Sequence, residues 1–328
     1  MILLEEIIRI LPIHFRKELM TKINQDWSQL QEIRIRIERP IELVFDQKTL
    51  WLRESCPTKQ DGQFIMNQLS EFSLYRLEEE LKQGYITVQG GHRVGLAGKV
   101  NTSNGQVKAI KDITSYNIRI AKQKKGVADP YVRHLFRERY LNTLIIGAPQ
   151  TGKTTLLRDI SRLIASGWGN VSPAKVGIVD ERSEIAGCIA GIPQHDIGIR
   201  SDVLDGCPKA EGMMMLIRSM SPEVIVVDEI GSLQDVSALQ EAIHAGVSIV
   251  CSAHGHSLTD IKSRSSFSSL FSEKVFDRFI ILQQTSAKDK VKQINDREEN
   301  IIMLNKGGRR GEMDRGNPIN LRNNANWG

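Results

Sequence analysis

The stretch from Leu144 to Ile160, "LIIGAPQTGKTTLLRDI", decides the fold. An apolar run typical of a strand ends at Gly147, and an apolar helical pattern resumes after Lys153. The residues from Gly147 to Thr154 match the spacing G-x-x-x-x-G-K-[ST] in the strand–loop–helix context that a phosphate-binding loop (P-loop) requires. The glycines let the backbone wrap closely around phosphate, with consecutive N–H groups directed inward. The sequence therefore predicts a site for a nucleoside triphosphate.

Within this loop, two side chains have specific predicted roles. We expect Lys153 to reach the β- and γ-phosphates and the Thr154 hydroxyl to ligate Mg²⁺. The helix that starts near Lys153 adds the positive end of its dipole. The predicted nucleotide-binding residues of the loop are Gly147, Ala148, Pro149, Gln150, Thr151, Gly152, Lys153, Thr154 and Thr155.

A second motif, "EVIVVDEIG", places two acids directly after a buried strand. We expect Asp228 to support the metal ion through water, and Glu229 to orient and deprotonate an attacking water. A P-loop followed by this acidic pair favours hydrolysis over phosphate transfer, because a kinase needs no water-activating glutamate. The alternative is an acidic pair that merely ends a strand.

Two further strand-like runs also end in polar residues. "GIVDERSEIAG" supplies Asp180, Glu181 and Glu184, and "VCSAHG" ends near His254. The carboxyl ends of parallel strands meet at one edge of a sheet, where ligands bind. We therefore expect these groups to share a site with Lys153, with Glu181 as a catalytic candidate. His254 is interpreted either as a γ-phosphate sensor or as an ordinary loop histidine.

The segment "GIPQHDIGIRSDVLDGCPKAEGMMMLIRSMSP" between these motifs is long and rich in glycine. Arg200 and Arg218 are candidates for binding phosphate, in the same subunit or in a neighbouring one. Surface salt bridges are the alternative for both arginines. The run Met213 to Met215 is expected to begin a helix and to pack in the core.

The hydrophobic pattern divides the chain into regions. From Leu141, aliphatic strand-like runs alternate with helical stretches, which predicts a mostly parallel sheet with helices on both faces. Residues 1–121 instead contain a period-two strand, "LQEIRIRIERPIELVF", and a hairpin, which predicts a small α+β domain. We assign residues 122–140 to a basic linker or helix, 141–305 to the ATPase domain and 306–328 to a flexible tail.

Composition narrows the class of protein. The chain has 328 residues and a net charge of +5, of which residues 306–328 contribute +3, so the body is nearly balanced. Four scattered cysteines without a C-x-x-C pair argue against a zinc knuckle or a disulfide framework and favour a reducing cytosol. The first residues, "MILLEEIIRILPIHF", read as an amphipathic helix rather than a secretory signal, with a membrane-surface helix as the alternative.

Four segments together resemble a known family: "GAPQTGKTTLLRDI", "VDERSEIAG", "DVLDGCPKAEGMMMLIRSMSPEVIVVDEIG" and "SAHG". They are similar to the stage III sporulation protein AA family, which itself resembles the secretion ATPases of type II and type IV systems. The resemblance implies a RecA-like core, ATP and Mg²⁺ as ligands, and a hexameric ring at the cytoplasmic face of a membrane channel between mother cell and forespore.

The resemblance also implies roles for particular residues. "VDERSE" matches the acidic box of secretion ATPases, Glu229 matches the glutamate of their Walker B motif, and His254 loosely matches their histidine box. Gly231 stands where the wider superfamily has an arginine, so no role is transferred for that arginine. Arg93 and Arg119 are possible counterparts of the arginines by which the N-terminal domain completes the nucleotide site in that family.

The leading hypothesis is a Mg²⁺-dependent ATPase motor that is a homo-oligomer, lies peripherally on the mother-cell side of a membrane complex and has channel proteins as partners. A nucleic-acid-dependent ATPase, such as a helicase or loader, is one alternative. The near-neutral body and an aromatic content of 5% disfavour it, because single-strand channels use basic grooves and stacking platforms. A nucleotide-binding scaffold with little turnover is the other alternative.

Overall fold

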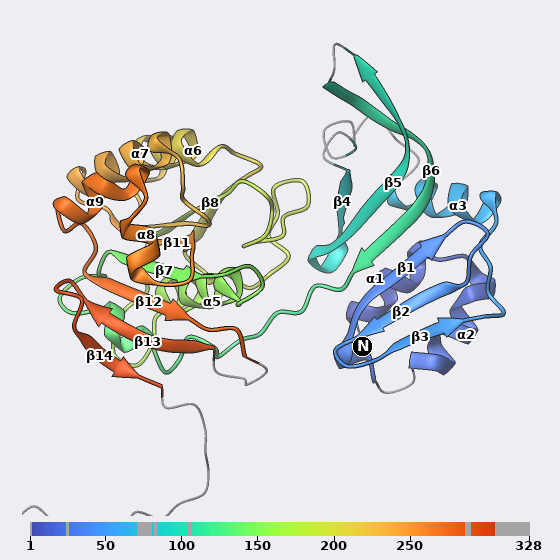
Figure 1. Ribbon diagram of the computed structural model, residues 1–328, viewed down its shortest axis with the longest axis horizontal. Helices are drawn as coiled ribbons and strands as arrows, with labels where there is room; N and C mark the ends of the chain where they lie inside the picture. Colours follow the sequence, from blue (N-terminus) through green and yellow to red (C-terminus); the bar gives the residue numbers. More distant parts are fainter. Residues whose placement is uncertain are drawn as a thin grey trace, which may run out of the picture.

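The structure, a computed structural model, describes residues 2–23, 26–70, 81, 84–103, 106–285 and 290–305. It consists of two lobes, each built on one sheet, that lie side by side (Figure 1). A small α+β N-terminal domain precedes an α/β core, as the sequence predicts. The tail predicted for residues 306–328 lies outside the described residues.

The N-terminal sheet is antiparallel, with the order β3-β2-β1-β6-β5-β4. The predicted period-two strand is present as β1 and β2, with Ile33 and Ile35 fully buried. The predicted hairpin joins β4 to β5 through Gly90 and Gly91, which have φ values of 83° and 74°. The strands are β1 (Leu30–Arg36), β2 (Ile41–Phe45), β3 (Thr49–Leu52), β4 (Tyr85–Val88), β5 (His92–Ser103) and β6 (Gln106–Arg119).

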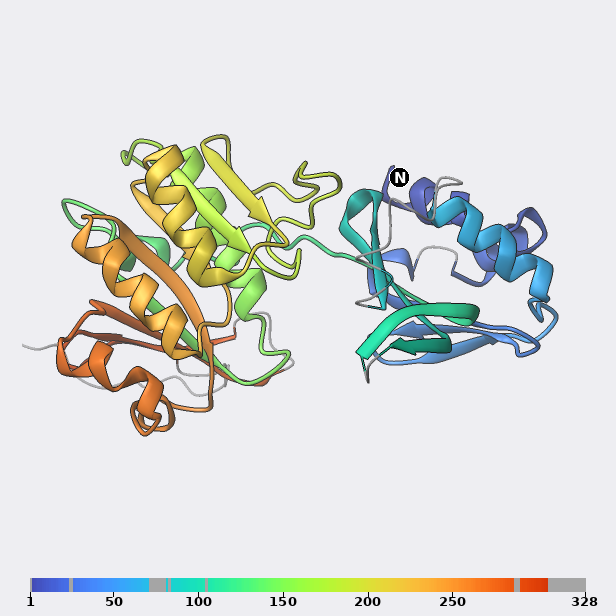
Figure 2. The ribbon, with the colours of Figure 1, turned by 90° about the horizontal axis from the view of Figure 1, so that it is seen from above.

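In the described part of the domain, three α-helices cover one face of this sheet (Figure 2). The apolar N-terminus forms two helices rather than one, because the chain turns at Leu11 and Pro12. Ile7 and Leu11 are buried in the core of the domain, so this part of the amphipathic pattern packs internally. The helices are α1 (Ile2–Ile10), α2 (Ile13–Ile23) and α3 (Lys59–Leu69), with the short 3-10 helices η1 (Asp26–Gln29) and η3 (Gln89–Gly91).

The core sheet has the order β14-β13-β12-β7-β11-β10-β8-β9. The strands from β12 to β9 are parallel, and β13 and β14 are antiparallel. The four strand-like runs quoted in the sequence analysis are present as β7, β8, β10 and β11. The strands are β7 (Thr143–Gly147), β8 (Val176–Asp180), β9 (Ser201–Asp205), β10 (Val224–Val227), β11 (Ser248–His254), β12 (Arg278–Leu282), β13 (Val291–Asp296) and β14 (Ile301–Leu304).

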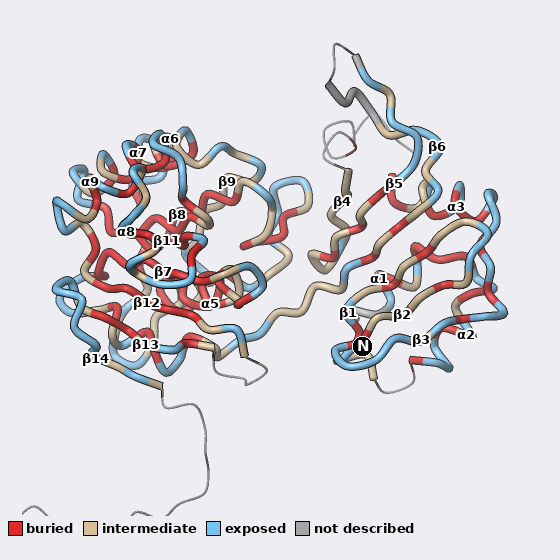
Figure 3. Tube along the Cα trace, viewed as in Figure 1, coloured by how far each residue is buried: buried red, intermediate tan, exposed pale blue. Residues whose placement is uncertain are grey.

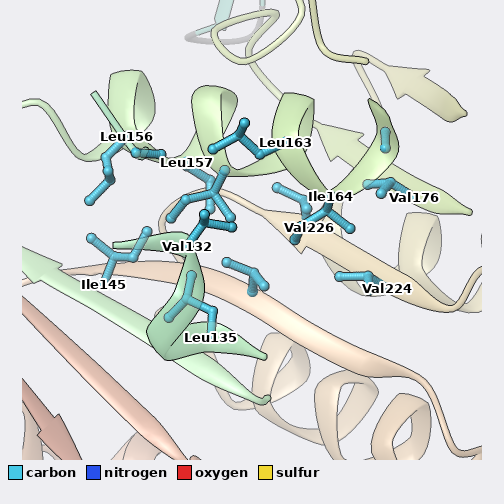
Figure 4. Close-up of a cluster of buried hydrophobic side chains, with 14 of the residues drawn as sticks. Val132, Leu135, Ile145, Leu156, Leu157, Leu163, Ile164, Val176, Val224 and Val226 are labelled. Atoms are coloured by element: carbon cyan, nitrogen blue, oxygen red, sulfur yellow. The ribbon is translucent and has the colours of Figure 1, made fainter. Parts of the chain in front are cut away.

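Helices cover both faces of the core sheet, and its central strands are buried (Figure 3). On one face, α5 (Lys153–Ser166) packs its leucines over Ile145 and Val226 (Figure 4). On the other face, Leu144 and Ile146 contact the remaining helices. Alternate residues of β7 therefore enter two different cores. The helices of the second face are α6 (Lys209–Met220), α7 (Leu233–His244), α8 (Leu258–Lys262), η5 (Ser265–Phe267) and α9 (Ser268–Ser272).

Two segments differ in detail from the sequence prediction. Residues 122–140 contain the 3-10 helix η4 (Val132–Leu135) and no α-helix, and both terminal residues of η4 are buried against α5. The methionine run does not begin a helix, since α6 starts four residues earlier, at Lys209. Met213 is fully buried, as expected, but Met215 is 49% exposed, so core packing is wrong for Met215.

Candidate functional site

The predicted phosphate loop joins β7 to α5 at the carboxyl edge of the core sheet. Its curvature needs left-handed backbone at Gln150 (φ 62°) and at Gly152 (φ 95°). The Thr151 hydroxyl donates to the carbonyl of Ala148 (2.8 Å) and stabilises the turn. Gly147 has no space for a side chain, because a Cβ would collide with Thr151. This geometry is the one expected of a loop that encloses phosphate.

Lys153 is the buried cation of this loop, with 4% of its side chain exposed. Its Nζ donates to the Ala148 carbonyl (3.3 Å) and lies 3.4 Å from Glu229 Oε1. The other carboxylate oxygen of Glu229 is 3.9 Å from the guanidinium of Arg182. The structure thus brings together the predicted phosphate ligand and the predicted base.

Thr154 and Asp228 form the second contact between the two motifs. The Thr154 hydroxyl donates to Asp228 Oδ2 at 2.6 Å, and Ser252 donates to Asp228 Oδ1. Burial raises the pKa of Asp228, and these two hydrogen bonds oppose that shift because they favour the carboxylate.

The donor set fits Mg²⁺. Thr154 and Asp228 present hard oxygen atoms, which this ion prefers, and Mg²⁺ in proteins usually completes its shell with phosphate and water. Within the described part of the chain, no group of three His, Cys, Asp or Glu side chains is arranged to hold a metal ion. A bound Mg²⁺ would therefore depend on oxygen atoms of the nucleotide.

The acids at the end of β8 and in the loop that follows it (the acidic loop, residues 180–187) differ in their surroundings. Asp180 is buried and accepts the backbone N–H groups of Glu184 (2.8 Å), Ile185 (3.0 Å) and Ala186 (2.8 Å). Burial raises the pKa of Asp180, and the three N–H donors oppose the shift. Asp180 therefore shapes the loop. Glu181, the predicted catalytic candidate, lies in the same loop and forms an ion pair with Lys209 of α6.

Arg158 on α5 contacts the acidic loop through hydrogen bonds to its backbone. The sequence did not predict a role for this arginine. Its guanidinium is 8% exposed and donates to the carbonyls of Glu184 and Ile185. Burial lowers the pKa of Arg158, and the nearby acids Asp180 and Asp228 oppose that shift. The signal available in the sequence was a charged pair, Arg158 and Asp159, between the apolar residues of "LLRDI".

The N-terminal domain reaches the same loop through Arg93. Its Nη1 lies 3.1 Å from Glu184 Oε1, its Nη2 donates to the Arg182 carbonyl, and its guanidinium lies 4.1 Å from the ring centroid of Tyr85. Arg119 stays within its own sheet, with Nε 4.0 Å from Glu32 Oε1. Only Arg93, of the two arginines considered, meets the acidic loop.

A second contact between the domains is formed by the segment Gln194 to Asp196. The Gly90 N–H donates to Gln194 Oε1 (3.3 Å), and the ring of His195 lies against Gly91. The linker residue Gln123 exchanges hydrogen bonds with the backbone of Asp196, and Lys125 pairs with its carboxylate (2.6 Å). Both Gln194 and His195 donate their N–H groups to the Ala186 carbonyl, which joins this segment to the acidic loop.

The structure does not bring Arg200 or Arg218 to the P-loop of their own chain. Arg200 precedes β9 and donates to the Pro173 carbonyl, at the amino ends of the strands. Arg218 is in the last turn of α6, which leads to the amino end of β10. In their own chain, both arginines thus lie toward the amino edge of the sheet, whereas the P-loop lies at the carboxyl edge. His254 is at the expected edge, in register with Gly147, and is exposed.

The searched part of the chain, residues 2–305 without the gaps given above, contains no helix that is both long enough and apolar enough to cross a bilayer.

Comparison with known proteins gives a consistent family. The family model described as "Sporulation stage III, protein AA" matches residues 3–302. The chain is 53% identical over 304 residues to the stage III sporulation protein AA of Bacillus subtilis (strain 168). The alignment covers 93% of this chain and 99% of that protein.

Solved structures with a similar fold include an ATPase and a pilus motor. The Legionella pneumophila ATPase DotB aligns with a TM-score of 0.59 and 16% identity, covering 86% of this chain and 81% of DotB. The pilus retraction motor PilT, solved with bound ADP, aligns with a TM-score of 0.57 and 14% identity, covering 87% and 82%. These similarities establish a RecA-like core with a preceding α+β domain. The match of the family model over residues 3–302 and the 53% identity to the Bacillus subtilis protein show that this chain belongs to the sporulation stage III protein AA family.

Proposed function

We propose that the chain is a Mg²⁺-dependent ATPase that converts ATP and water to ADP and phosphate. One observation carries the proposal: Lys153 and Thr154 of the P-loop each contact an acid that follows β10, at 3.4 Å and 2.6 Å respectively. An ammonium that can bind phosphate, a hydroxyl that can bind the metal ion and two carboxylates thus meet at one edge of the sheet. ATP hydrolysis needs these groups together.

Each of these side chains has a distinct proposed task. Lys153 binds the β- and γ-phosphates, assisted by the N–H groups of the loop and the first turn of α5. Thr154 and Asp228 hold Mg²⁺, which when bound neutralises charge on the phosphates. Glu229, which is 41% exposed, orients the attacking water and accepts its proton. Glu181 and His254 lie at the same edge. Glu181 is proposed as a further catalytic residue, and His254 is proposed to sense the γ-phosphate.

We further propose that hydrolysis drives movement of the N-terminal domain relative to the core. The supporting observation is that Arg93 and the segment Gln194 to Asp196 join the N-terminal domain to the acidic loop. By family membership, the motor is proposed to work as a hexameric ring on the cytoplasmic side of a sporulation membrane channel, with channel proteins as partners. In such a ring, Arg200 and Arg218 remain available to a neighbouring subunit.

The decisive experiment replaces the proposed base. Glu229→Gln keeps the size of the side chain but cannot accept a proton, so steady-state turnover should fall by about 10² to 10⁴. Glu241→Gln, at an exposed position on α7, is the matched control and should retain wild-type turnover. Binding of a fluorescent, non-hydrolysable ATP analogue should persist in both variants.

Full turnover in a well-purified Glu229→Gln protein would overturn the assignment of the base. Negligible turnover of the wild type, even with membrane partners present, would favour a nucleotide-binding scaffold. Stimulation by DNA or RNA that falls steeply with salt would favour the nucleic-acid-dependent alternative.

A further inference from the structure

Ser252 lies between the two motifs of the proposed site without belonging to either. Its strand, β11, separates β7, which leads to the P-loop, from β10, which leads to Asp228. Cys251 pairs with Val227 in the neighbouring strand, so Ser252 is level with the next residue, Asp228. Ser252 is also in the same face of β11 as Val250, which packs in the core beneath α5. The strand order therefore directs this hydroxyl toward the helix that begins at the P-loop.

The hydroxyl of Ser252 joins the two acids. It donates a hydrogen bond to Asp228 Oδ1 and accepts one from the backbone N–H of Glu229 at 2.9 Å. The backbone carbonyl of Ser252 also accepts a hydrogen bond from the N–H of Ile230 at 2.8 Å. Ser252 is fully buried, so water cannot replace these contacts without a rearrangement of the turn.

The turn that Ser252 supports has an unfavourable backbone conformation. Glu229 has φ 52°, in the left-handed region that a residue with a side chain rarely adopts. Such a conformation persists only when surrounding contacts hold it in place, and it is found preferentially at functional sites. The hydrogen bonds from Glu229 and Ile230 to Ser252 are contacts of this kind.

We infer that Ser252 is a positioning residue that fixes the Asp228 carboxylate against Thr154 and holds Glu229 in place to act on the attacking water. The inference rests on the proposed function. The proposed role of Ser252 is exerted through Asp228 and Glu229, not through direct contact with phosphate or the attacking water. With one donor and one acceptor contact, it uses the two capacities of a hydroxyl to couple the metal-binding acid to the base.

The inference predicts a specific defect in Ser252→Ala. The outer partners of metal ligands typically contribute 10- to 100-fold to metal affinity or activity. We therefore expect kcat to fall by about 10- to 100-fold and the Mg²⁺ concentration for half-maximal binding of a fluorescent, non-hydrolysable ATP analogue to rise about tenfold. Affinity for that analogue without Mg²⁺ should stay within about threefold of the wild type, because Ser252 does not touch the P-loop backbone.

Ser248→Ala is a matched control on the same strand. Ser248 is also buried and donates its hydroxyl to the Tyr140 carbonyl at 2.8 Å, at the opposite end of β11. The loss of a buried serine hydrogen bond is thus common to both variants, and only Ser252→Ala should change the Mg²⁺ dependence. Ser252→Cys, which fills nearly the same volume with a weak donor, replaces the alanine variant if the latter does not fold.

The result can contradict the inference independently of the proposed function. If the wild type hydrolyses ATP and Ser252→Ala has kcat and Mg²⁺ dependence within twofold of it, the inference is overturned while the ATPase stands. Equal defects in Ser248→Ala also overturn it, since they would mean a general loss of packing. If the wild type has no turnover, the Mg²⁺ titration of analogue binding still decides whether Ser252 supports Asp228.

Discussion

Lys153 and Glu229 form an ion pair in which the ammonium lies 3.4 Å from the carboxylate. The lysine is almost completely buried, whereas 41% of the Glu229 side chain is exposed. A phosphate bound by Lys153 would therefore compete with Glu229 for the same ammonium. Displacement of the carboxylate by phosphate would free Glu229 to contact water only when nucleotide is present.

This competition predicts that Glu229→Gln binds nucleotide slightly more tightly. A partly exposed ion pair contributes about 0 to 1 kcal/mol, which corresponds to a gain of up to about fivefold in affinity for an ATP analogue. Equilibrium titration with a fluorescent analogue measures the change, and Glu241→Gln is again the control. A tenfold loss of affinity would instead mean that the carboxylate supports the loop.

The ion pair between Arg93 and Glu184 predicts that the two domains move more freely in Arg93→Ala. The variant loses the ion pair, the hydrogen bond to the Arg182 carbonyl and the contact with Tyr85. Because both charged groups are partly exposed, the free energy of unfolding should fall by only about 0 to 1 kcal/mol. Amide hydrogen exchange in residues 182–187 should accelerate, because the loop that carries these amides would lose a restraint.

Arg34→Ala provides the control for this experiment. Arg34 pairs with Glu32 of the same strand, β1, at 2.7 Å inside the N-terminal sheet. The Arg34→Ala variant loses a similar surface ion pair and should leave amide hydrogen exchange in residues 182–187 unchanged. Unaltered exchange in Arg93→Ala as well would mean that Arg93 does not restrain the loop.

Helix α6 packs closely on β8 at Gly212, so we expect a larger residue at this position to destabilise the protein. A Cβ at this helical position would lie 2.5 Å from Val179 Cγ1, whereas a Cβ at Gly231 would meet no atom within 4 Å. Alanine improves helix propensity by about 1 kcal/mol, but overpacking typically destabilises by about 1 to 3 kcal/mol. Urea unfolding should therefore show a net loss of stability in Gly212→Ala and a change within about 0.5 kcal/mol in Gly231→Ala.

Much of the core was predictable because its strands are continuous apolar runs that end in charged residues. All four residues of β10, for example, are buried from both sides, so the run "VIVV" fixes both the strand and the position of Asp228. The contacts of Lys153 and Thr154 with the acids after β10 then follow from parallel strands that share one edge. The partial burial of β9 explains why "SDVLD" gave no comparable signal.

The remaining parts of the site depend on topology and on remote partners. Arg200 and Arg218 lie in a segment whose pattern does not reveal at which edge of the sheet each arginine emerges. The pairing of Glu181 with Lys209, and of Arg93 with Glu184, joins residues that the local pattern leaves independent. Ser252 had only a weak signal, a polar residue inside the apolar run of β11, and its role needs the knowledge that β11 lies between β7 and β10.

His195 predicts a pH dependence of stability at the contact between the domains. Burial lowers its pKa to about 4, assisted by the charges of Arg158 and His92. In the unfolded chain a histidine has a pKa of about 6.5, so between pH 6.5 and 4 the unfolded state binds more protons. The free energy of unfolding should therefore decrease as the pH falls through this window. The full effect is bounded by about 3 kcal/mol, since one pKa unit corresponds to about 1.4 kcal/mol.

The measurement compares urea unfolding of the wild type and His195→Gln from pH 7 to pH 4. Carboxylates titrate in both proteins, so the difference between the two curves isolates the contribution of this histidine. The stability advantage of the wild type should shrink steadily below pH 6.5. His244→Gln, at an exposed position in the last turn of α7, controls for the loss of a histidine as such. A difference between wild type and His195→Gln that stays constant with pH would contradict burial of a neutral His195 against Gly91.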